Sequence, residues 1–174
     1  MNTSLLLSKF GLPVFLGTLT LNGFIERAMN NPDIDTFKPI DTVSIIVPSF
    51  NEERFIKKSL SSIRGQSILN EYPEYFEIIL VDSESIDNTV PIAESYVDRI
   101  ITTKVRGKLT ARNSATLQSN GNIIVSVDSD SYYPPFWLNT LLEPFNNIDN
   151  PSYNNKIAGV VGSTYDPDIP GIPI

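Results

Sequence analysis

The sequence contains no cysteine and no histidine. Without cysteine the chain cannot form disulfide bonds, zinc thiolate sites or a cysteine nucleophile. Without histidine it lacks the side chain that proteins use most often as a general base and as a metal ligand. Any acid–base chemistry must therefore come from carboxylates, tyrosine or lysine.

Basic stretches are also missing. The chain has 13 lysines and arginines against 20 aspartates and glutamates, which gives a net charge of −7. No lysine- or arginine-rich stripe occurs, so we expect no nucleic acid as a partner. An anionic nucleotide is not excluded, because a metal ion and a few well-placed cations can reverse the sign of the local field.

The chain also lacks a clean transmembrane run. Residues 1–30 are rich in leucine, but Pro13 and Asn22 interrupt the apolar stretch, which is poor for a membrane span of about 20 apolar residues. It also lacks the strongly basic start of a secretory signal. We expect residues 1–40 to form an extension and linker that packs on the domain or on a partner, with a membrane-contacting helix as the alternative. The expected location is cytoplasmic, with peripheral attachment to a membrane left open.

The remaining residues, 41–174, have the size and composition of one α/β domain with a real core. Hydrophobic patterning predicts strands at 43–47, 76–81, 99–102, 121–127 and 157–162, and helices at 52–64, 89–96, 109–118 and 136–145. Pro48 is expected to stop the first strand. Strands alternating with helices predict a doubly wound, mostly parallel sheet flanked by helices.

Two acids one residue apart, Asp128 and Asp130, follow the apolar run 121–127. Acids at the carboxyl end of a parallel strand face the crevice where open α/β sheets bind ligands. Their hard oxygen atoms can hold a divalent cation, and the cation can neutralise a diphosphate. Because Asp82 ends another predicted strand, the pattern predicts a sugar-nucleotide site.

Two further segments, 47–53 and 81–89, leave strands at the same edge. Phe50 offers a ring face to a base, and Asp82 can accept the N–H of a uracil-type base. Asp87 or Asn88 is expected to cap the following helix, and we interpret Asp87 as a turn and capping residue. For 47–53 the alternative, an ordinary loop with acids favoured at a helix N-terminus, stays open.

Four segments in order, 48–52, 81–89, 107–113 and 128–130, resemble the motifs of the family 2 glycosyltransferases with the GT-A fold. The resemblance covers residues 43–162 and implies a nucleoside-diphosphate-sugar site. By this resemblance, Pro48, Phe50 and Glu52 line the nucleoside pocket, Asp82 contacts the base, Lys108 and Arg112 anchor base or phosphate, Asp128, Ser129 and Asp130 contact the donor, and Asp128 and Asp130 bind Mn²⁺ or Mg²⁺.

The sequence departs from the family pattern at three places. Glu84 replaces a usual glycine, and Ser131 stands where many members have a third acid. Family members carry the catalytic base well beyond the Asp-x-Asp element, and the last two acids of this chain are Asp166 and Asp168. Asp166 is the candidate base, although its proline-flanked context also suits a solvated turn residue.

The sequence therefore predicts a metal-dependent, inverting glycosyltransferase that moves a sugar, expected to come from a UDP-sugar, to a hydroxyl on a glycan, lipid or protein. One alternative is a sugar-nucleotide-binding module without turnover, or the donor-binding part of a larger enzyme. A nucleotidyltransferase is the third possibility. It would need a glycine-rich, basic loop where residues 50–53 are acidic.

Overall fold

The computed structural model describes residues 39, 41–104 and 107–146. These residues belong to two units, one reaching residue 134 and one starting at residue 135, and each is described by itself. The predicted extension, the expected strand at 157–162 and Asp166 lie outside the described residues. Within the described ranges, no helix is both long and apolar enough to cross a membrane.

The first unit is built on a four-stranded parallel sheet. Its strands are β1 (Val43–Ser49), β2 (Phe76–Asp82), β3 (Arg99–Thr102) and β4 (Ile123–Ser126), arranged in the order β3-β2-β1-β4. The chain moves outward from β1 to β3 and then returns to place β4 on the other side of β1. The predicted α/β fold with a parallel sheet is confirmed.

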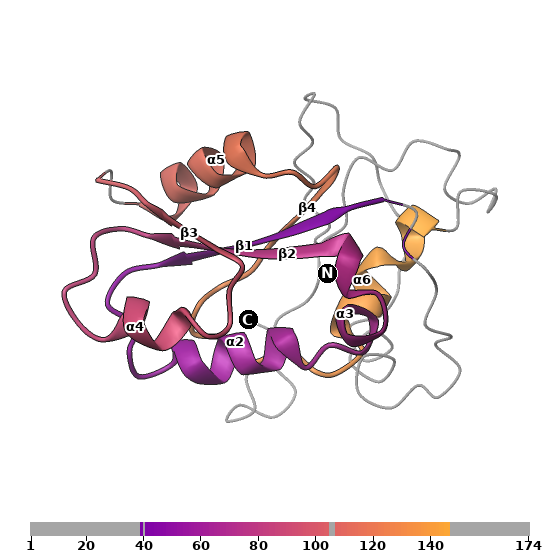
Figure 1. The fold of residues 1–174 in the computed structure, drawn as a ribbon, viewed down its shortest axis with the longest axis horizontal. Helices are drawn as coiled ribbons and strands as arrows, with labels where there is room; N and C mark the ends of the chain where they lie inside the picture. Colours follow the sequence, from indigo (N-terminus) through magenta and orange to yellow (C-terminus); the bar gives the residue numbers. More distant parts are fainter. Residues whose placement is uncertain (1–38, 40, 105–106, 147–174) are drawn as a thin grey trace, which may run out of the picture. The chain divides into compact units, whose positions relative to one another are not determined.

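Helices cover both faces of this sheet (Figure 1). α5 (Lys108–Gln118) lies along one face, whereas α2 (Ile56–Arg64) and α4 (Thr89–Ala93) lie along the other. A short helix, α3 (Ser67–Glu71), and a 3₁₀ turn, η1 (Pro73–Tyr75), connect α2 to β2. Patterning did not predict these two short elements. The second unit contains α6 (Trp137–Asn146).

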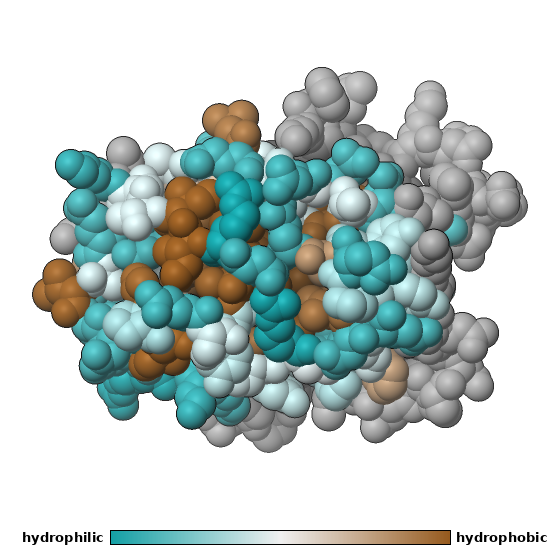
Figure 2. All heavy atoms as spheres, in the orientation of Figure 1, coloured by the Kyte–Doolittle hydropathy of each residue, from teal (hydrophilic) through white to brown (hydrophobic). Residues whose placement is uncertain are grey.

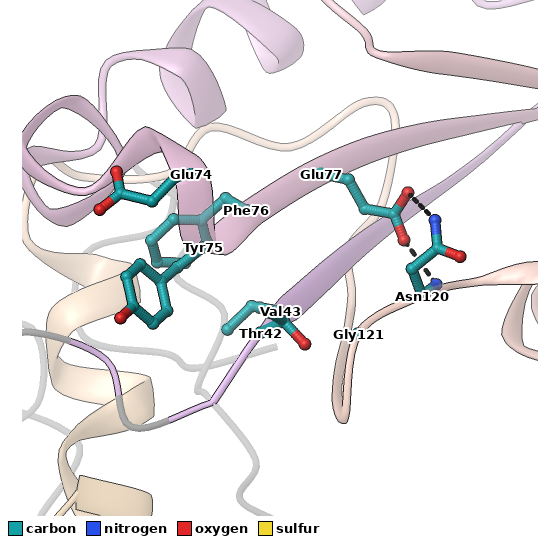
Figure 3. Close-up of a pocket in the computed structure, with 8 residues that line it drawn as sticks. All are labelled: Thr42, Val43, Glu74, Tyr75, Phe76, Glu77, Asn120 and Gly121. Carbon is teal, nitrogen blue, oxygen red and sulfur yellow. Dashed lines mark hydrogen bonds between the residues drawn. The ribbon is translucent and has the colours of Figure 1, made fainter.

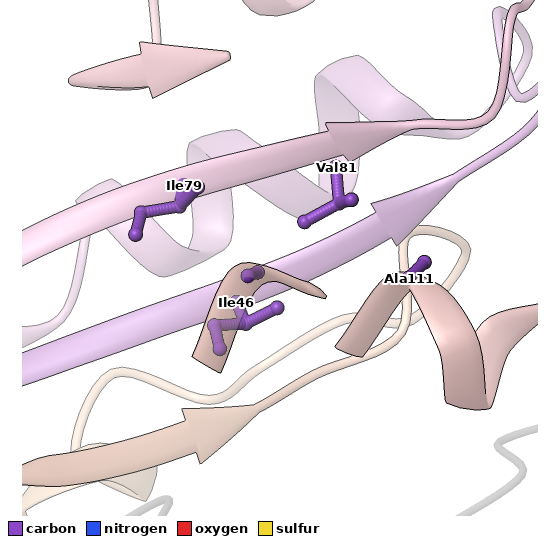
Figure 4. Packing of buried hydrophobic residues seen from close by; sticks show 5 residues of the cluster. Ile46, Ile79, Val81 and Ala111 are labelled. Atoms are coloured by element: carbon purple, nitrogen blue, oxygen red, sulfur yellow. The ribbon is translucent and has the colours of Figure 1, made fainter. Parts of the chain in front are cut away.

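The core follows from the alternation of strand side chains. Ile46 of β1 and Ile79 and Val81 of β2 pack with Ala111 and Ala115 of α5 (Figure 4). The two alanines bury a face of α5 that is small enough for the helix to pack closely on the sheet. The alternate strand residues are buried toward the opposite face. Burying one isoleucine or valine side chain completely contributes about 1.5–3 kcal/mol to the free energy of unfolding.

Pro48 does not stop β1, which continues to Ser49. The carbonyl of Ile46 accepts from the N–H of Val127 beyond β4, while the carbonyl of Ser49 accepts from Ser83 beyond β2. Along β1, the backbone groups of successive residues point alternately toward β4 and toward β2, so those of Pro48, like those of Ile46, point toward β4. There β4 has already ended at Ser126, so the missing N–H of proline removes no bond from the sheet.

Two predicted helices start or end differently. α2 begins at Ile56 rather than at residue 52, because residues 52–55 form a turn in which Phe55 and Ile56 both donate to the carbonyl of Glu52 at 2.9 Å. α4 ends at Ala93 rather than near residue 96.

On the face drawn in Figure 2, apolar patches are broken up by hydrophilic residues.

At the amino end of the strands, the Glu77 side chain contacts three other segments of the chain beside a shallow hollow of about 160 Å³ (Figure 3). Its carboxylate accepts hydrogen bonds from the Ser44 hydroxyl of β1 and from both the backbone N–H and the side-chain amide of Asn120, at 2.7 and 3.2 Å. Arg99 of β3 lies 3.4 Å away. Burial alone would raise the pKa of Glu77, but the hydrogen bonds from Ser44 and Asn120 outweigh it and lower this pKa.

Replacing Glu77 by glutamine is expected to lower the free energy of unfolding at neutral pH by about 1–3 kcal/mol, because charge-assisted hydrogen bonds are lost. The folded-state pKa lies below the ordinary 4.5. The stabilisation is therefore present above that value and is lost as pH falls through the folded pKa. Urea unfolding of wild type and variant at about pH 7 and about pH 3 measures this. A difference that stays constant with pH would contradict it.

Candidate donor site

All predicted donor-site residues are described, and they lie at the carboxyl end of the sheet. They come from the end of β1 and the loop after it, the end of β2, the first turns of α5 and the turn after β4: Pro48, Phe50, Glu52, Asp82, Lys108, Arg112, Asp128, Ser129 and Asp130. The strand order reverses between β1 and β4, which is where open α/β sheets form a ligand crevice.

Asp128 is held by two cations from α5. The guanidinium of Arg112 lies 2.9 Å and the ammonium of Lys108 lies 3.4 Å from the same oxygen, Oδ1. All three side chains are partly exposed, so each pair contributes little stability on its own. The buried Nε of Arg112 has no hydrogen-bond partner. The structure thus brings together three residues that the sequence assigned to the donor site.

Negative charge is concentrated beside this cation pair. Partial burial raises the pKa of Glu52, and the carboxylates of Asp130, Asp87 and Asp128 raise it further, while Lys108 lowers it. Among the residues that the structure describes, no three acids lie close enough to form a metal site by themselves. Carboxylate oxygens nevertheless suit Mn²⁺ or Mg²⁺. The residues present fit a cation that shares its ligands with a diphosphate and water.

Asp82 lies at the end of β2 and is 3% exposed. Its Oδ2 accepts from the N–H of Ser85 at 3.0 Å, but its buried Oδ1 has no hydrogen-bond partner. The same is true of the hydroxyl of Ser49, which is the neighbour of Asp82 across β1 and β2. Buried polar groups without partners are rare, and both atoms can still accept or donate a hydrogen bond to a ligand or a water molecule. The sequence identified Asp82 but not Ser49, since only strand register shows that this serine is buried beside it.

The loops after β1 and β2 are locked together by hydrogen bonds. Backbone N–H groups of residues 51–53 donate to the side chains of Ser85, Thr89 and Asp87 at 2.7–3.1 Å. In return, Asn51 and Glu53 side chains accept from backbone N–H groups of residues 86 and 88. Asp87 also accepts from the N–H of Thr89, the first residue of α4, while the N-cap position itself is Asn88 and makes no side-chain cap hydrogen bond. Ordinary loop interactions therefore account for part of both motifs.

Glu84 adopts a left-handed backbone, with φ of 58°, at the position where the resemblance described above implies a glycine. Left-handed geometry costs a residue with a β-carbon about 1–2 kcal/mol, whereas glycine adds about 0.5–1 kcal/mol of unfolded-chain entropy. Glu84→Gly is therefore expected to raise the free energy of unfolding by up to about 1 kcal/mol in urea titrations. Glu94→Gly, at φ of −49°, is the matched control and should lower it. A loss of stability in both variants would contradict the strain.

Tyr133 lies beneath the turn that carries Asp128 and is 9% exposed. Its hydroxyl accepts from the backbone N–H of Asp128 at 2.8 Å and donates to the carbonyl of the same residue at 3.1 Å. Burial, the largest cause, raises the pKa of Tyr133 to about 12. The hydroxyl therefore stays protonated at neutral pH and can act as both donor and acceptor. Nothing in the sequence pattern distinguishes Tyr133 from its exposed neighbour, Tyr132.

One family pattern, described as Glycosyl transferase family 2, matches residues 44–165. This span covers more than half of the chain and contains all four motif segments. The chain therefore belongs to glycosyltransferase family 2, as its motifs predict.

Curated proteins and solved structures agree with this assignment. The poly(ribitol-phosphate) β-N-acetylglucosaminyltransferase TarS of Staphylococcus aureus is 34% identical over 96 residues, which cover 51% of this chain and 16% of TarS. The Escherichia coli UDP-Glc:α-D-GlcNAc-diphosphoundecaprenol β-1,3-glucosyltransferase WfgD is 32% identical over 105 residues, which cover 58% of this chain and 38% of WfgD. In both cases the chain spans less than two fifths of the relative's length.

Among solved structures, a TarS fragment crystallised with UDP-GlcNAc matches with a TM-score of 0.52 and 30% identity, covering 62% of this chain and 31% of that one. A mannosyltransferase from Pyrobaculum calidifontis, solved with GDP-Man and Mn²⁺, matches with a TM-score of 0.55 at 24% identity, covering 75% and 38%. The second likeness concerns the fold alone. Together they confirm the predicted GT-A type of fold.

Proposed function

We propose that this chain binds a nucleoside-diphosphate sugar and transfers the sugar to a hydroxyl acceptor. The buried carboxylate oxygen of Asp82 that has no partner carries this proposal. It lies at the same sheet edge as the acids that follow β4, so a base, a ribose and a diphosphate can be placed along that edge.

The nucleoside half of the donor is assigned to the ends of β1 and β2. Asp82 accepts an N–H from the base, and the ring face of Phe50, which is 38% exposed, stacks on it. Pro48 and Glu52 complete the pocket, with Glu52 near the ribose. A uracil base offers the N–H that Asp82 requires. TarS was crystallised with UDP-GlcNAc, and the name of WfgD specifies UDP-Glc. Both support a UDP-sugar as donor.

The diphosphate half is assigned to α5 and the turn after β4. Asp128 and Asp130 would hold Mn²⁺ or Mg²⁺, with Ser129 between them against the donor. When bound, that cation neutralises charge on the departing nucleoside diphosphate. Lys108 and Arg112 hold Asp128 in place through the 3.4 and 2.9 Å contacts. They also supply positive charge to an anionic ligand in a protein whose net charge is −7.

Transfer of the sugar to the acceptor requires a catalytic base. A carboxylate removes the proton of the acceptor hydroxyl, whose oxygen attacks the anomeric carbon opposite the leaving diphosphate and inverts it. Asp166 stays the predicted base. A sugar-nucleotide-binding module, or the donor-binding part of a larger enzyme, would bind the donor without this step.

Calorimetric titration of UDP, UDP-glucose, UDP-GlcNAc and GDP-mannose, with Mn²⁺ and with chelator, tests the proposal. Uridine nucleotides are expected to bind with Kd on the order of micromolar in Mn²⁺ and at least about 100-fold more weakly in chelator. GDP-mannose is expected to bind at least about tenfold more weakly than the uridine nucleotides in Mn²⁺. Absence of binding by every nucleotide would overturn the donor site. Binding without release of UDP from any UDP-sugar, with or without acceptors, would favour the binding module.

A further inference from the structure

The Asp-x-Asp turn is held from below by a layer of buried polar side chains. Asp128 offers two backbone groups to Tyr133, and its carbonyl accepts a second hydrogen bond, at 3.2 Å, from the hydroxyl of Ser59 on α2. The N–H and carbonyl of one residue point to the same side only when its backbone is extended. Beyond the end of β4, the Tyr133 hydroxyl therefore bonds to the N–H and carbonyl of Asp128 as the backbone of a neighbouring strand would.

The backbone of Tyr133 is in turn bonded to α2 and to Gln66, which lies between α2 and α3. Its N–H donates to the hydroxyl of Ser62 at 3.1 Å, and its carbonyl accepts from the side-chain amide of Gln66 at 3.2 Å. The same amide donates to the carbonyls of Pro134 and Ser62, at 2.7 and 3.0 Å. Gln66 is 1% exposed, so these bonds are shielded from water and the phenol has little freedom to move.

We propose that Tyr133 is a positioning residue, which fixes the backbone of Asp128 so that the carboxylates of Asp128 and Asp130 meet a divalent cation and a diphosphate together. This inference rests on the proposed function. The carboxylates themselves are partly or fully exposed, and the cations that contact Asp128, Lys108 and Arg112, are 59% and 33% exposed. The buried hydroxyl of Tyr133 bonds to both backbone groups of Asp128, whereas the Ser59 hydroxyl bonds to the carbonyl alone. Loss of this hydroxyl leaves the Asp128 N–H without its partner and the turn free to shift.

Tyr133→Phe removes one oxygen atom and keeps the buried ring. The affinity of UDP in the presence of Mn²⁺ is expected to fall about tenfold, the effect of losing one or two hydrogen bonds. UDP binding in chelator should not change. Tyr132→Phe is the matched control, because Tyr132 is 57% exposed and its ring lies under Lys58; it should leave both affinities unchanged.

Amide hydrogen exchange of Asp128, followed by NMR without nucleotide, provides a readout independent of binding. Exchange should become faster in Tyr133→Phe and stay unchanged in Tyr132→Phe. If Tyr133→Phe does not fold, Ser59→Ala removes the second bond to the Asp128 carbonyl and is expected to weaken Mn²⁺-dependent binding about twofold to threefold.

The outcomes separate this inference from the proposed function. The positioning role alone would be overturned by the following result. The wild type binds UDP with Mn²⁺, and Tyr133→Phe shows the same metal dependence of UDP binding and the same exchange rate of the Asp128 amide as the wild type. Wild-type protein that binds no nucleotide would overturn both. A parallel loss of affinity with and without Mn²⁺ would assign Tyr133 to general stability and also overturn the inference.

Discussion

Asp130→Asn is expected to weaken Mn²⁺-dependent binding of UDP at least about 100-fold while leaving the fold intact. Asp130 is exposed, and its carboxylate makes no hydrogen bond or ion pair with another described residue. Its removal therefore breaks no internal contact. It also relieves Glu52, whose pKa is raised by burial first and by Asp130 next, so stability should not fall.

Calorimetric titration with Mn²⁺ and with chelator measures the effect, and thermal unfolding checks the fold. Glu71→Gln is the charge-matched control, because Glu71 lies on α3 and is exposed. The control should bind as wild type does. If Asp130→Asn retained full Mn²⁺-dependent affinity, the cation would have to be held elsewhere, and the assignment of Asp130 would be wrong.

Gly121→Ala is expected to lower the free energy of unfolding by about 3 kcal/mol or more. A β-carbon at Gly121 would lie 2.4 Å from the backbone nitrogen and 2.6 Å from the hydroxyl oxygen of Ser44, and 2.8 Å from the carbonyl carbon of Val43. Both residues belong to β1, a central strand that is paired on both sides. Neither backbone can move without breaking those pairs.

The hydrogen bond from the Gly121 N–H to the Ser44 hydroxyl, at 2.7 Å, would be lost in the same substitution. Urea unfolding measures the change. Gly65→Ala is the control: its nearest contact is at 3.2 Å and its φ is −78°, so it should change stability by less than about 1 kcal/mol. Equal effects at the two glycines would show that β1 adjusts to the added carbon.

The sequence could predict the strands that carry the site because buried parallel strands are continuous apolar runs. It could also place Asp82 and Asp128 at one edge, since all strands of a parallel sheet end there. These predictions depend on local pattern alone. The predicted roles of Pro48, Phe50, Glu52, Ser129 and the other site residues stay predictions that nucleotide titrations will test.

The features that the sequence could not predict depend on contacts between residues that are distant in the chain. The continuation of β1 through Pro48 depends on where β4 stops. The orientation of Lys108 and Arg112 toward Asp128 depends on the packing of α5, and the sequence assigned both cations only to the base or phosphate. Burial of Tyr133 but not Tyr132 depends on α2, which no local periodicity reports.

Helix α2 is connected to both halves of the proposed donor site. Immediately before it, the turn at residues 52–55 continues the loop that is locked to residues 85–89. Ser59 and Ser62 on the helix, and Gln66 just beyond its end, bond to the segment that runs from Asp128 to Pro134. A rotation or axial shift of this one helix would therefore move the base pocket and the acidic turn in the same motion.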